Sequence, residues 1–218
     1  MFKHQQPQSS LHKSQEAGYT IIESLVAMIV VSVLMIAIAP VMAFSVATRV
    51  QAKRIEMATQ AAKTYIEALR SEALKQGGPI PGFPAPSTTG KELEKTAAPG
   101  NINNLFCIDK DSVPLCQADS NEDLVVQGYY FNNLPATTNP AKTGYSLIVR
   151  VYRANSFASG VGALKTQNDL QAQQGTTTAG LGNLRAPLVE MRTEIGASDR
   201  QGAYNSLCTR INGPTGCQ

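Results

Sequence analysis

The feature that most constrains this chain is a run of apolar residues near its N-terminus. Residues 25–44 form a stretch of twenty residues, and no charged residue lies between Glu23 and Arg49. A helix of twenty residues spans about 30 Å, the thickness of the hydrocarbon core of a bilayer. We therefore expect a membrane-spanning helix, and we ask why an acid, Glu23, lies at its start.

Two simpler interpretations compete with this one. In a secretory signal peptide, Ala37-Ile38-Ala39 would be the cleavage site. Cleavage there would release 39 residues, which is longer than usual, and Pro40 would follow the cut. A plain single-pass anchor is the second alternative. The basic residues do not decide its orientation in the membrane, because they lie on both sides of the run, at Lys3, Lys13, Arg49, Lys53 and Arg54.

The helical pattern continues beyond the apolar run. Apolar residues recur there at spacings of three and four, and the stripe consists of Ala58, Ala61, Ala62, Tyr65, Ile66, Leu69 and Ala73. Such a stripe predicts a helix from about residue 20 to residue 75 that packs one face against a sheet. The glycines and proline of residues 76–79 are expected to stop it.

Residues 124–131 are rich in β-forming residues, and apolar residues alternate at 145–153 and 188–195. These three segments predict half-buried antiparallel strands, with a short fourth strand at 105–108. Residues 77–90 contain four prolines and are expected to form a loop. Residues 154–186, rich in Gly, Gln, Thr and Ala, are expected to form a long exposed excursion. The predicted fold class is therefore α+β, with a long N-terminal helix packed on an antiparallel sheet.

The four cysteines form two pairs of equal spacing, Cys107/Cys116 and Cys208/Cys217. Neither pair has the C-x-x-C spacing of zinc or redox motifs. An even number of cysteines in a loop-rich domain beyond a membrane segment favours disulfides in an oxidising compartment. Four cysteines allow three pairings. The two local ones, Cys107–Cys116 and Cys208–Cys217, are expected, with reduced buried thiols as the alternative.

Acidic and amide residues gather around the first cysteine pair, at Asp109, Asp111, Asp119, Asn121, Glu122 and Asp123. The spacing of Asp119, Asn121 and Asp123 is similar to the start of a calcium loop. Leu124, however, stands where such a loop needs glycine. A solvated acidic loop is the favoured interpretation, and we expect no metal site and no cofactor.

The residues before the apolar run carry a specific motif. Gly18-Tyr19-Thr20-Ile21-Ile22-Glu23 follows seventeen mostly polar residues and leads directly into the run. This arrangement resembles the class III signal of type IV prepilins and pseudopilins. The resemblance implies cleavage after Gly18 by an inner-membrane prepilin peptidase, N-methylation of Tyr19 by the same enzyme, and a key acid at Glu23. Tyr19 stands where Phe is usual, and Pro40 matches a helix-softening proline of many type IV pilins.

In that family the glutamate neutralises the new α-amine of a neighbouring subunit and sets the axial stagger between subunits. The resemblance assigns this role to Glu23. Ionisable groups in membrane segments usually have a partner. The spacing from Thr20 to Glu23 also fits a capping box, in which the acid serves only the helix start. The preceding glycine and polar leader favour the assembly role.

The resemblance implies four regions. They are a cleaved leader at 1–18, a transmembrane and assembly half-helix at 19–48, a periplasmic half-helix at 49–76 and a globular pilin-like β domain at 77–218. The chain would be a single-pass protein of the inner membrane, with its leader cytoplasmic and its domain periplasmic, and would later enter a filament at the cell surface. Its partners would be the prepilin peptidase/methyltransferase, other pilins or pseudopilins, membrane lipid and an inner-membrane assembly platform with its ATPase.

The expected function is a minor pilin or pseudopilin of a type IV pilus or of a type II secretion-like filament. Residues 26–34 resemble the minor, GspI/PilV-like branch, and residues 184–192 resemble cyanobacterial pseudopilins of hormogonium polysaccharide secretion. The alternative is a filament-tip adhesin, or a module that binds polysaccharide or a surface through residues 154–186.

An enzyme is disfavoured by the sequence. The only histidines, His4 and His12, lie in the leader, so the mature chain would lack the usual base of hydrolases and the usual ligand of metal sites. No nucleophile elbow, phosphate loop or metal-ligand spacing is present. The net charge of +3 is small and scattered, so no nucleic-acid partner is expected.

We predict that the mature chain begins at Tyr19. The intact mass of the protein extracted from membranes should lack residues 1–18 when the prepilin peptidase is present and should retain them when it is deleted. A wild-type protein that keeps its first eighteen residues in the membrane would contradict the processing hypothesis.

Overall fold

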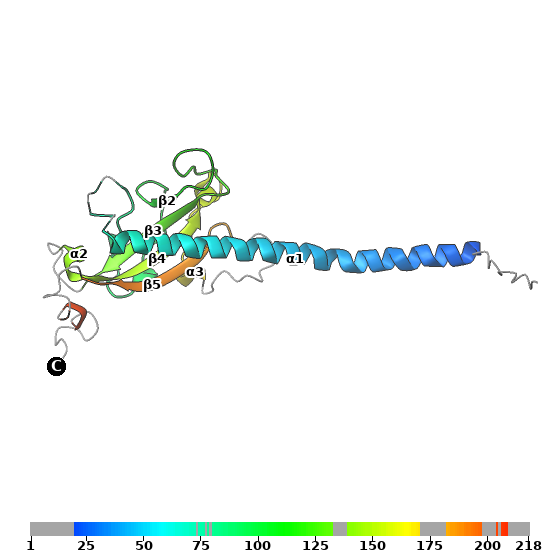
Figure 1. Ribbon diagram of the computed structural model, residues 1–218, viewed down its shortest axis with the longest axis horizontal. Coiled ribbons are helices and arrows are strands. Elements are labelled where there is room, and N and C mark those ends of the chain that lie inside the picture. The colour runs from blue at the N-terminus through cyan, green and yellow to red at the C-terminus, as the bar shows by residue number, and fades with distance from the viewer. Residues whose placement is uncertain are drawn as a thin grey trace, which may run out of the picture. The chain divides into compact units, whose positions relative to one another are not determined.

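The computed structural model describes residues 20–72, 74–76, 78, 80–132, 139–170, 182–197, 204 and 206–208. The chain divides into two compact units, residues 1–43 and residues 44–218. The long helix α1 (Ile21–Arg70) begins in the first unit and ends in the second (Figure 1). All the described strands belong to the second unit.

Helix α1 confirms the predicted long helix, but it ends at Arg70, before the predicted end at Lys75. The chain turns at Glu72, whose φ of 54° lies in the left-handed region. The N–H of Leu74 then donates to the carbonyl oxygen of Ala68 at 3.2 Å. This turn brings the Leu74 side chain into the core. Its burial stabilises by about 1.5–3 kcal/mol, which offsets the roughly 1–2 kcal/mol that a left-handed residue costs.

The sheet has five strands: β1 (Ala85–Pro86), β2 (Phe106–Ile108), β3 (Leu124–Phe131), β4 (Tyr145–Arg153) and β5 (Val189–Ile195). Their order is β1-β3-β4-β5, and β2 also pairs with β3. All pairs are antiparallel except β1 with β3, which is parallel. The four predicted strands are confirmed. Strand β1 corrects the expectation that residues 77–90 form only a loop, since proline is tolerated at the edge of a sheet.

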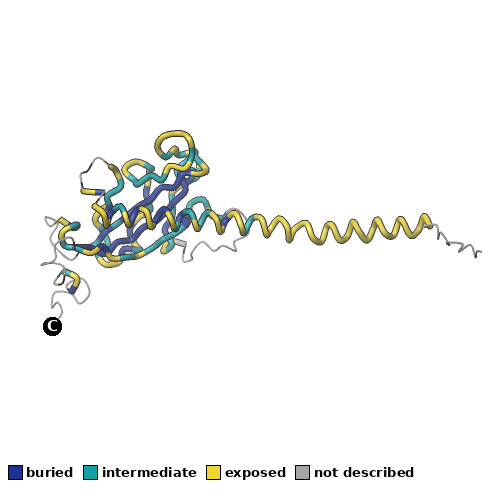
Figure 2. Tube along the Cα trace, in the orientation of Figure 1, coloured by how far each residue is buried: buried dark blue, intermediate teal, exposed yellow. Residues whose placement is uncertain are grey.

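One face of the sheet packs against the C-terminal half of α1. All the described residues of the predicted stripe are buried: Ala58, Ala61, Ala62, Tyr65, Ile66 and Leu69. They join one hydrophobic core with alternate side chains of the strands, such as Val126 in β3 and Leu147 and Val149 in β4. Figure 2 shows the buried residues concentrated in these strands and along α1 where it crosses them. Ala73 lies outside the described residues.

A close contact between Tyr65 of α1 and Gly128 of β3 fits the helix to the sheet. A Cβ atom at Gly128 would overlap the Tyr65 Oη and would lie 3.0 Å from the Tyr65 Cε1, tighter than most real contacts. The Tyr65 hydroxyl donates to the carbonyl oxygen of Gly82 at 2.7 Å. Burial raises the pKa of Tyr65, so this hydroxyl stays a neutral donor. Because Gly128 has no side chain, Tyr65 can link helix, sheet and the loop before β1.

The opposite face of the sheet is also covered at β4 and along most of β3, so these two strands are more buried than expected, whereas β5 is half-buried as predicted. All nine residues of β4 are buried. Residues 91–97, which include the 3₁₀ helix η1 (Leu93–Lys95), lie over this face and contact Arg150. The Tyr152 hydroxyl donates to the carbonyl oxygen of Lys165 at 2.9 Å on the same side. Polar residues along β4 therefore point into a second covered layer and not into water.

Arg150 is the central residue of that layer. Its Nε donates to Oε2 of Glu190 in β5 at 2.7 Å, and its other nitrogens donate to the carbonyl oxygens of Thr96 at 2.8 Å and Glu94 at 2.9 Å. The Arg150 side chain is 1% exposed and that of Glu190 is 10% exposed. A buried cation without partners would be very costly. Here the ion pair and the carbonyl groups fix residues 91–97 to the sheet.

The connections after β4 are more ordered than expected. In the described parts of residues 154–186, the Ser156 hydroxyl donates to the Leu184 carbonyl oxygen at 2.7 Å, and the Lys165 N–H donates to the Arg185 carbonyl oxygen at 2.8 Å. These parts therefore lie against the domain, and residues 171–181 lie outside the described residues. Besides η1, the described residues form three further short helices between strands: α2 (Pro140–Thr143), the 3₁₀ helix η2 (Ala154–Phe157) and α3 (Gln167–Leu170).

The predicted disulfide between Cys107 and Cys116 is present. It joins β2 to the acidic loop, and closing a loop of this size should stabilise the fold by about 2–3 kcal/mol in the chain-entropy model. Cys208 is buried, and its predicted partner, Cys217, lies outside the described residues.

Replacing Arg150 with Met should lower the free energy of unfolding by about 3–5 kcal/mol, because Glu190 would remain as a buried carboxylate without its cation. Chemical denaturation of the full chain in detergent, followed by circular dichroism, measures the change. Arg192→Met is the matched control. Arg192 is 54% exposed and lies 3.7 Å from Glu94, so its loss should cost less than about 1 kcal/mol. If the two variants lost equal free energy of unfolding, the buried Arg150–Glu190 pair would contribute no more to stability than the exposed Arg192.

Candidate functional site

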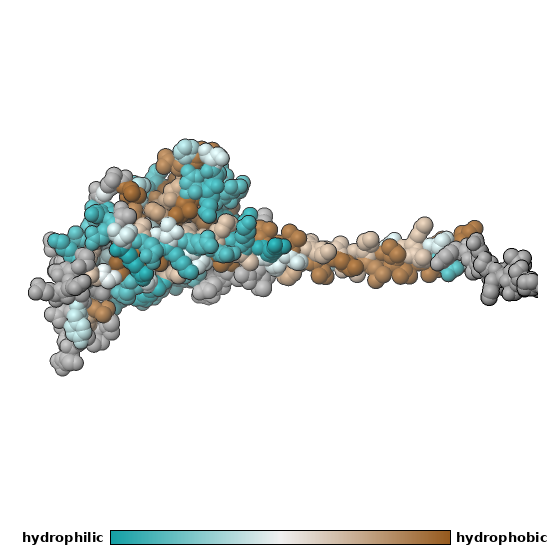
Figure 3. All heavy atoms as spheres, in the orientation of Figure 1, coloured by the Kyte–Doolittle hydropathy of each residue, from teal (hydrophilic) through white to brown (hydrophobic). Residues whose placement is uncertain are grey.

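The N-terminal half of α1 presents apolar side chains all around. Every residue from Ile21 to Val46 is exposed. Of the described helices, α1 alone is long and apolar enough to cross a membrane. Residues 21–43 rise about 35 Å at 1.5 Å per residue, which is sufficient for a hydrocarbon core of about 30 Å. Figure 3 shows the apolar side chains along this segment. Such a surface is unfavourable in water, so it needs lipid or other apolar helices around it.

The start of α1 is capped by Thr20. The N–H of Glu23 donates to Thr20 Oγ1 at 3.3 Å, and the N–H of Ser24 donates to the Thr20 carbonyl oxygen at 3.2 Å. Only one half of a capping box is thus formed: the Thr20 side chain accepts from the backbone N–H of Glu23. Among the described residues, the Glu23 carboxylate has no hydrogen bond or ion pair. It lies exposed in the first turn, where the helix dipole favours negative charge.

Ser32 and Pro40 are the two residues that depart from the apolar pattern of residues 25–44. Ser32 Oγ donates to the carbonyl oxygen of Met28 at 2.7 Å, so its hydroxyl has a partner without water. Pro40 lies within α1 and has no N–H, so the Ile36 carbonyl lacks its usual helical donor. The boundary between the two compact units follows directly after Ala43.

The residues predicted for processing and assembly do not form a single cluster. Glu23 and Pro40 are separated by about 25 Å along α1, as the helical rise per residue requires. Gly18 and Tyr19 lie outside the described residues. The site is therefore a linear one, made of the start and the surface of a helix.

The acidic loop owes its form to its own carboxylates. One oxygen each from Asp109, Asp111 and Asp123 lies within 4.8 Å of the others. Asp123 is fully buried and accepts from the N–H of Lys110 at 2.9 Å and of Gln117 at 3.4 Å. This corrects the expectation of a wholly solvated loop. Asp123 acts as an internal acceptor for the backbone, a role that its position before a β-strand did not reveal.

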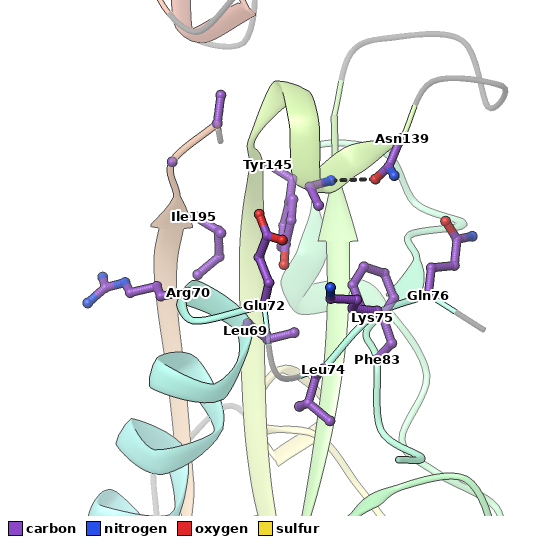
Figure 4. Close-up of a pocket in the computed structure, with 13 residues that line it drawn as sticks. Leu69, Arg70, Glu72, Leu74, Lys75, Gln76, Phe83, Asn139, Tyr145 and Ile195 are labelled. Carbon is purple, nitrogen blue, oxygen red and sulfur yellow. Dashed lines mark hydrogen bonds between the residues drawn. The ribbon is translucent and has the colours of Figure 1, made fainter. Parts of the chain in front are cut away.

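A hollow of about 580 Å³ lies at the C-terminal end of α1 (Figure 4). Leu69, Leu74 and Tyr145 give it apolar walls, while Glu72 and Lys75 contribute charged groups. Burial raises the pKa of Tyr145. Sequence reasoning missed this hollow because its residues come from the end of α1, the following turn and two strands, which are far apart along the chain.

The comparisons with known proteins agree with the motif at the start of the helix. Residues 13–39 match the family model of the prokaryotic N-terminal methylation motif. This segment contains the proposed cleavage site, Glu23 and most of the apolar run. No curated protein and no solved structure matches the chain.

Proposed function

We propose that this type IV pilin-like protein is a minor pilin or pseudopilin, a structural subunit of a type IV pilus or a type II secretion-like filament. One observation carries the proposal: the methylation motif at residues 13–39 leads into a helix whose first half is exposed and apolar. The second unit has a hydrophobic core of its own that does not use this half. The apolar half is therefore available for a bilayer first and for other helices later.

In this proposal the prepilin peptidase cuts after Gly18 and methylates Tyr19. Residues 19–48 then anchor and assemble the subunit, residues 49–76 support the sheet, and residues 77–218 form the globular domain. The leader that is removed carries both histidines. An assembly platform with its ATPase would move the processed subunit from the membrane into the filament.

The Cys107–Cys116 disulfide supports a periplasmic domain, because disulfides persist in oxidising compartments. The cytoplasmic side is the place of the leader, where the peptidase acts. The subunit would thus cross the inner membrane once, with residue 44 and all that follows on the outer side.

Glu23 would pair with the α-amine that cleavage creates on a neighbouring subunit. A carboxylate at the centre of a helix in lipid costs about 2.5–3.5 kcal/mol on insertion scales. Opposite charges 4 Å apart attract by about 4 kcal/mol at an effective dielectric constant of 20. The two magnitudes are similar, so a neighbour's amine can offset the cost of taking Glu23 into an apolar helix bundle. Since the carboxylate is not used for capping, it is free for this role.

Pro40 would soften the helix inside the filament. The missing hydrogen bond at the Ile36 carbonyl lowers the cost of bending or opening one turn there.

A tip subunit that binds a ligand is the second candidate. The hollow in Figure 4 favours this candidate. The hollow lies at the C-terminal end of α1, which is about 39 Å along the helix from residue 44. A site there would be remote from the membrane and would combine apolar walls with charged groups.

Glu23→Gln should reduce incorporation into filaments by at least about tenfold, because Gln keeps the size of Glu but not its charge. Thr20→Ala should cost the helix start only about 1 kcal/mol and leave assembly largely intact. The sheared filament fraction, normalised to the membrane pool of the subunit, measures both effects.

Glu56→Gln is the matched control, since Glu56 is exposed on the part of α1 beyond the apolar run. Formation of the Cys107–Cys116 disulfide in each variant shows that the domain has folded. Normal incorporation of the Glu23→Gln variant would reject the charge-pair mechanism. If Thr20→Ala and Glu23→Gln reduced incorporation equally, capping would be the favoured role of this turn.

A further inference from the structure

Tyr145, the first residue of β4, carries a buried hydroxyl group without a hydrogen bond. The residue is 1% exposed, and its ring packs against that of Tyr130, with the ring centroids 5.4 Å apart. The hydroxyls of Tyr65 and Tyr152 donate to carbonyl oxygens, whereas that of Tyr145 has no partner among the described residues. Because a buried tyrosine hydroxyl usually has a hydrogen-bond partner, the missing partner points to an occupant of the space beside this ring.

That space is the hollow at the end of α1 (Figure 4). Tyr145 lines it together with the apolar side chains of Leu74 and Phe83, and its volume is about 580 Å³. Sites for small molecules have volumes of roughly 300–1,000 Å³. Burial, and to a lesser degree the neighbouring Tyr130, raises the pKa of Tyr145. The hydroxyl is therefore neutral at physiological pH and can both donate to a ligand and accept from it.

Two polar side chains of the hollow are held in place by ordered backbone. Asn139 Oδ1 accepts from the N–H of Ala141 at 3.0 Å and so caps α2, and the amide N–H groups of Asn139 have no partner among the described residues. Glu72 occupies the left-handed turn after α1, where its φ is 54°. A ligand in the hollow thus meets an amide donor and a carboxylate acceptor that are already positioned, which lowers the cost of binding.

The charges of the hollow balance each other. Glu72 and Lys75 contribute one charge of each sign, and Arg70 forms an ion pair with Glu67 at 3.2 Å. An ionic ligand would therefore lose its hydration without gaining an excess of opposite charge. A wholly apolar ligand would leave the Tyr145 hydroxyl unpaired. The ligand that fits is neutral and carries hydroxyl groups beside an apolar C–H surface, and this is the chemistry of a neutral sugar.

We propose that this hollow binds a neutral sugar residue. One sugar hydroxyl pairs with the hydroxyl of Tyr145, while others donate to Glu72 and accept from the Asn139 amide. The C–H face of the sugar ring packs against Phe83, which is half-buried in the wall of the hollow. The proposal rests on the second candidate function, a subunit that binds a ligand, and names the class of that ligand.

The test uses the full processed chain, purified in a zwitterionic detergent that has no sugar headgroup. Saturation-transfer difference NMR would be recorded with four neutral disaccharides at millimolar concentration: maltose, cellobiose, lactose and N,N′-diacetylchitobiose. The neutral peptide acetyl-Leu-Ser-Leu-amide serves as the alternative probe. We expect transfer of saturation to at least one disaccharide and none to the peptide.

Tyr145→Phe removes the hydroxyl and keeps the ring, so it should weaken sugar binding about three- to tenfold. The Tm of the unliganded protein should not fall, because this hydroxyl has no partner within the described domain. Tyr152→Phe is the matched control. Its hydroxyl donates to the carbonyl oxygen of Lys165 at 2.9 Å, on the face of the sheet away from α1, so this variant should lose stability and keep sugar binding.

Asn139→Asp tests the second polar group. It keeps the oxygen that caps α2 but removes the amide donors, and should weaken sugar binding by a similar factor. Asn101→Asp makes the same change at an exposed residue outside the hollow, where Oδ1 accepts from the N–H of Asn103 at 3.0 Å. This control variant should bind the sugar as the wild-type chain does.

A wild-type chain that binds none of the disaccharides would overturn the proposal. Binding that is unchanged in Tyr145→Phe and Asn139→Asp would also overturn it, as would a lower Tm of Tyr145→Phe without loss of binding. Binding of the peptide alone would keep a ligand site in the hollow but assign it to a protein segment. The N-terminal mass and membrane fractionation of the same samples report on the pilin role, which a processed membrane protein without sugar binding would leave standing.

Discussion

The packing of the second half of α1 on the sheet is the interaction on which the rest of the structure depends. It combines a stripe of small residues, Ala58, Ala61 and Ala62, with one large residue, Tyr65, that fits over Gly128. Small residues let the helix approach the strands closely, and the tyrosine fixes its position through the hydrogen bond to Gly82. The first half of the helix is then free to contact lipid, because the described core takes its α1 residues from the second half alone.

The domain is stabilised on both faces of a thin sheet. One face carries the helix, and the other carries residues 91–97, which Arg150 and Glu190 hold in place. A sheet of three long strands has little apolar area to bury on one side alone. Covering both faces makes β4 a fully buried strand, and the Cys107–Cys116 bond adds a covalent constraint at the edge near β2. The globular unit therefore does not need the anchor segment to fold.

Sequence reasoning found the elements whose pattern repeats within one segment. The stripe from Ala58 to Leu69, the β-forming composition of β3 and the alternation in β4 and β5 were sufficient to predict helix and strands. The motif around Gly18 and Glu23 was sufficient to predict the class of protein. Features that depend on contacts between distant segments were missed. The burial of Arg150 needs residues 91–97, and the hollow of Figure 4 needs Phe83 and Tyr145 beside the end of α1. The early end of α1 depends on the core position of Leu74, which no local pattern encodes.

The charges of β5 affect whether two copies of this domain can pair through the edges of their sheets. Among the described strands, β5 lies at the outside of the sheet, and its charged side chains Glu190, Arg192 and Glu194 occupy every second position. If two copies joined their β5 strands antiparallel about Arg192, that arginine would face its own copy and each Glu190 would face a Glu194. Like charges directly opposite are destabilising in a sheet. Antiparallel pairing of two β5 strands in this register is therefore disfavoured.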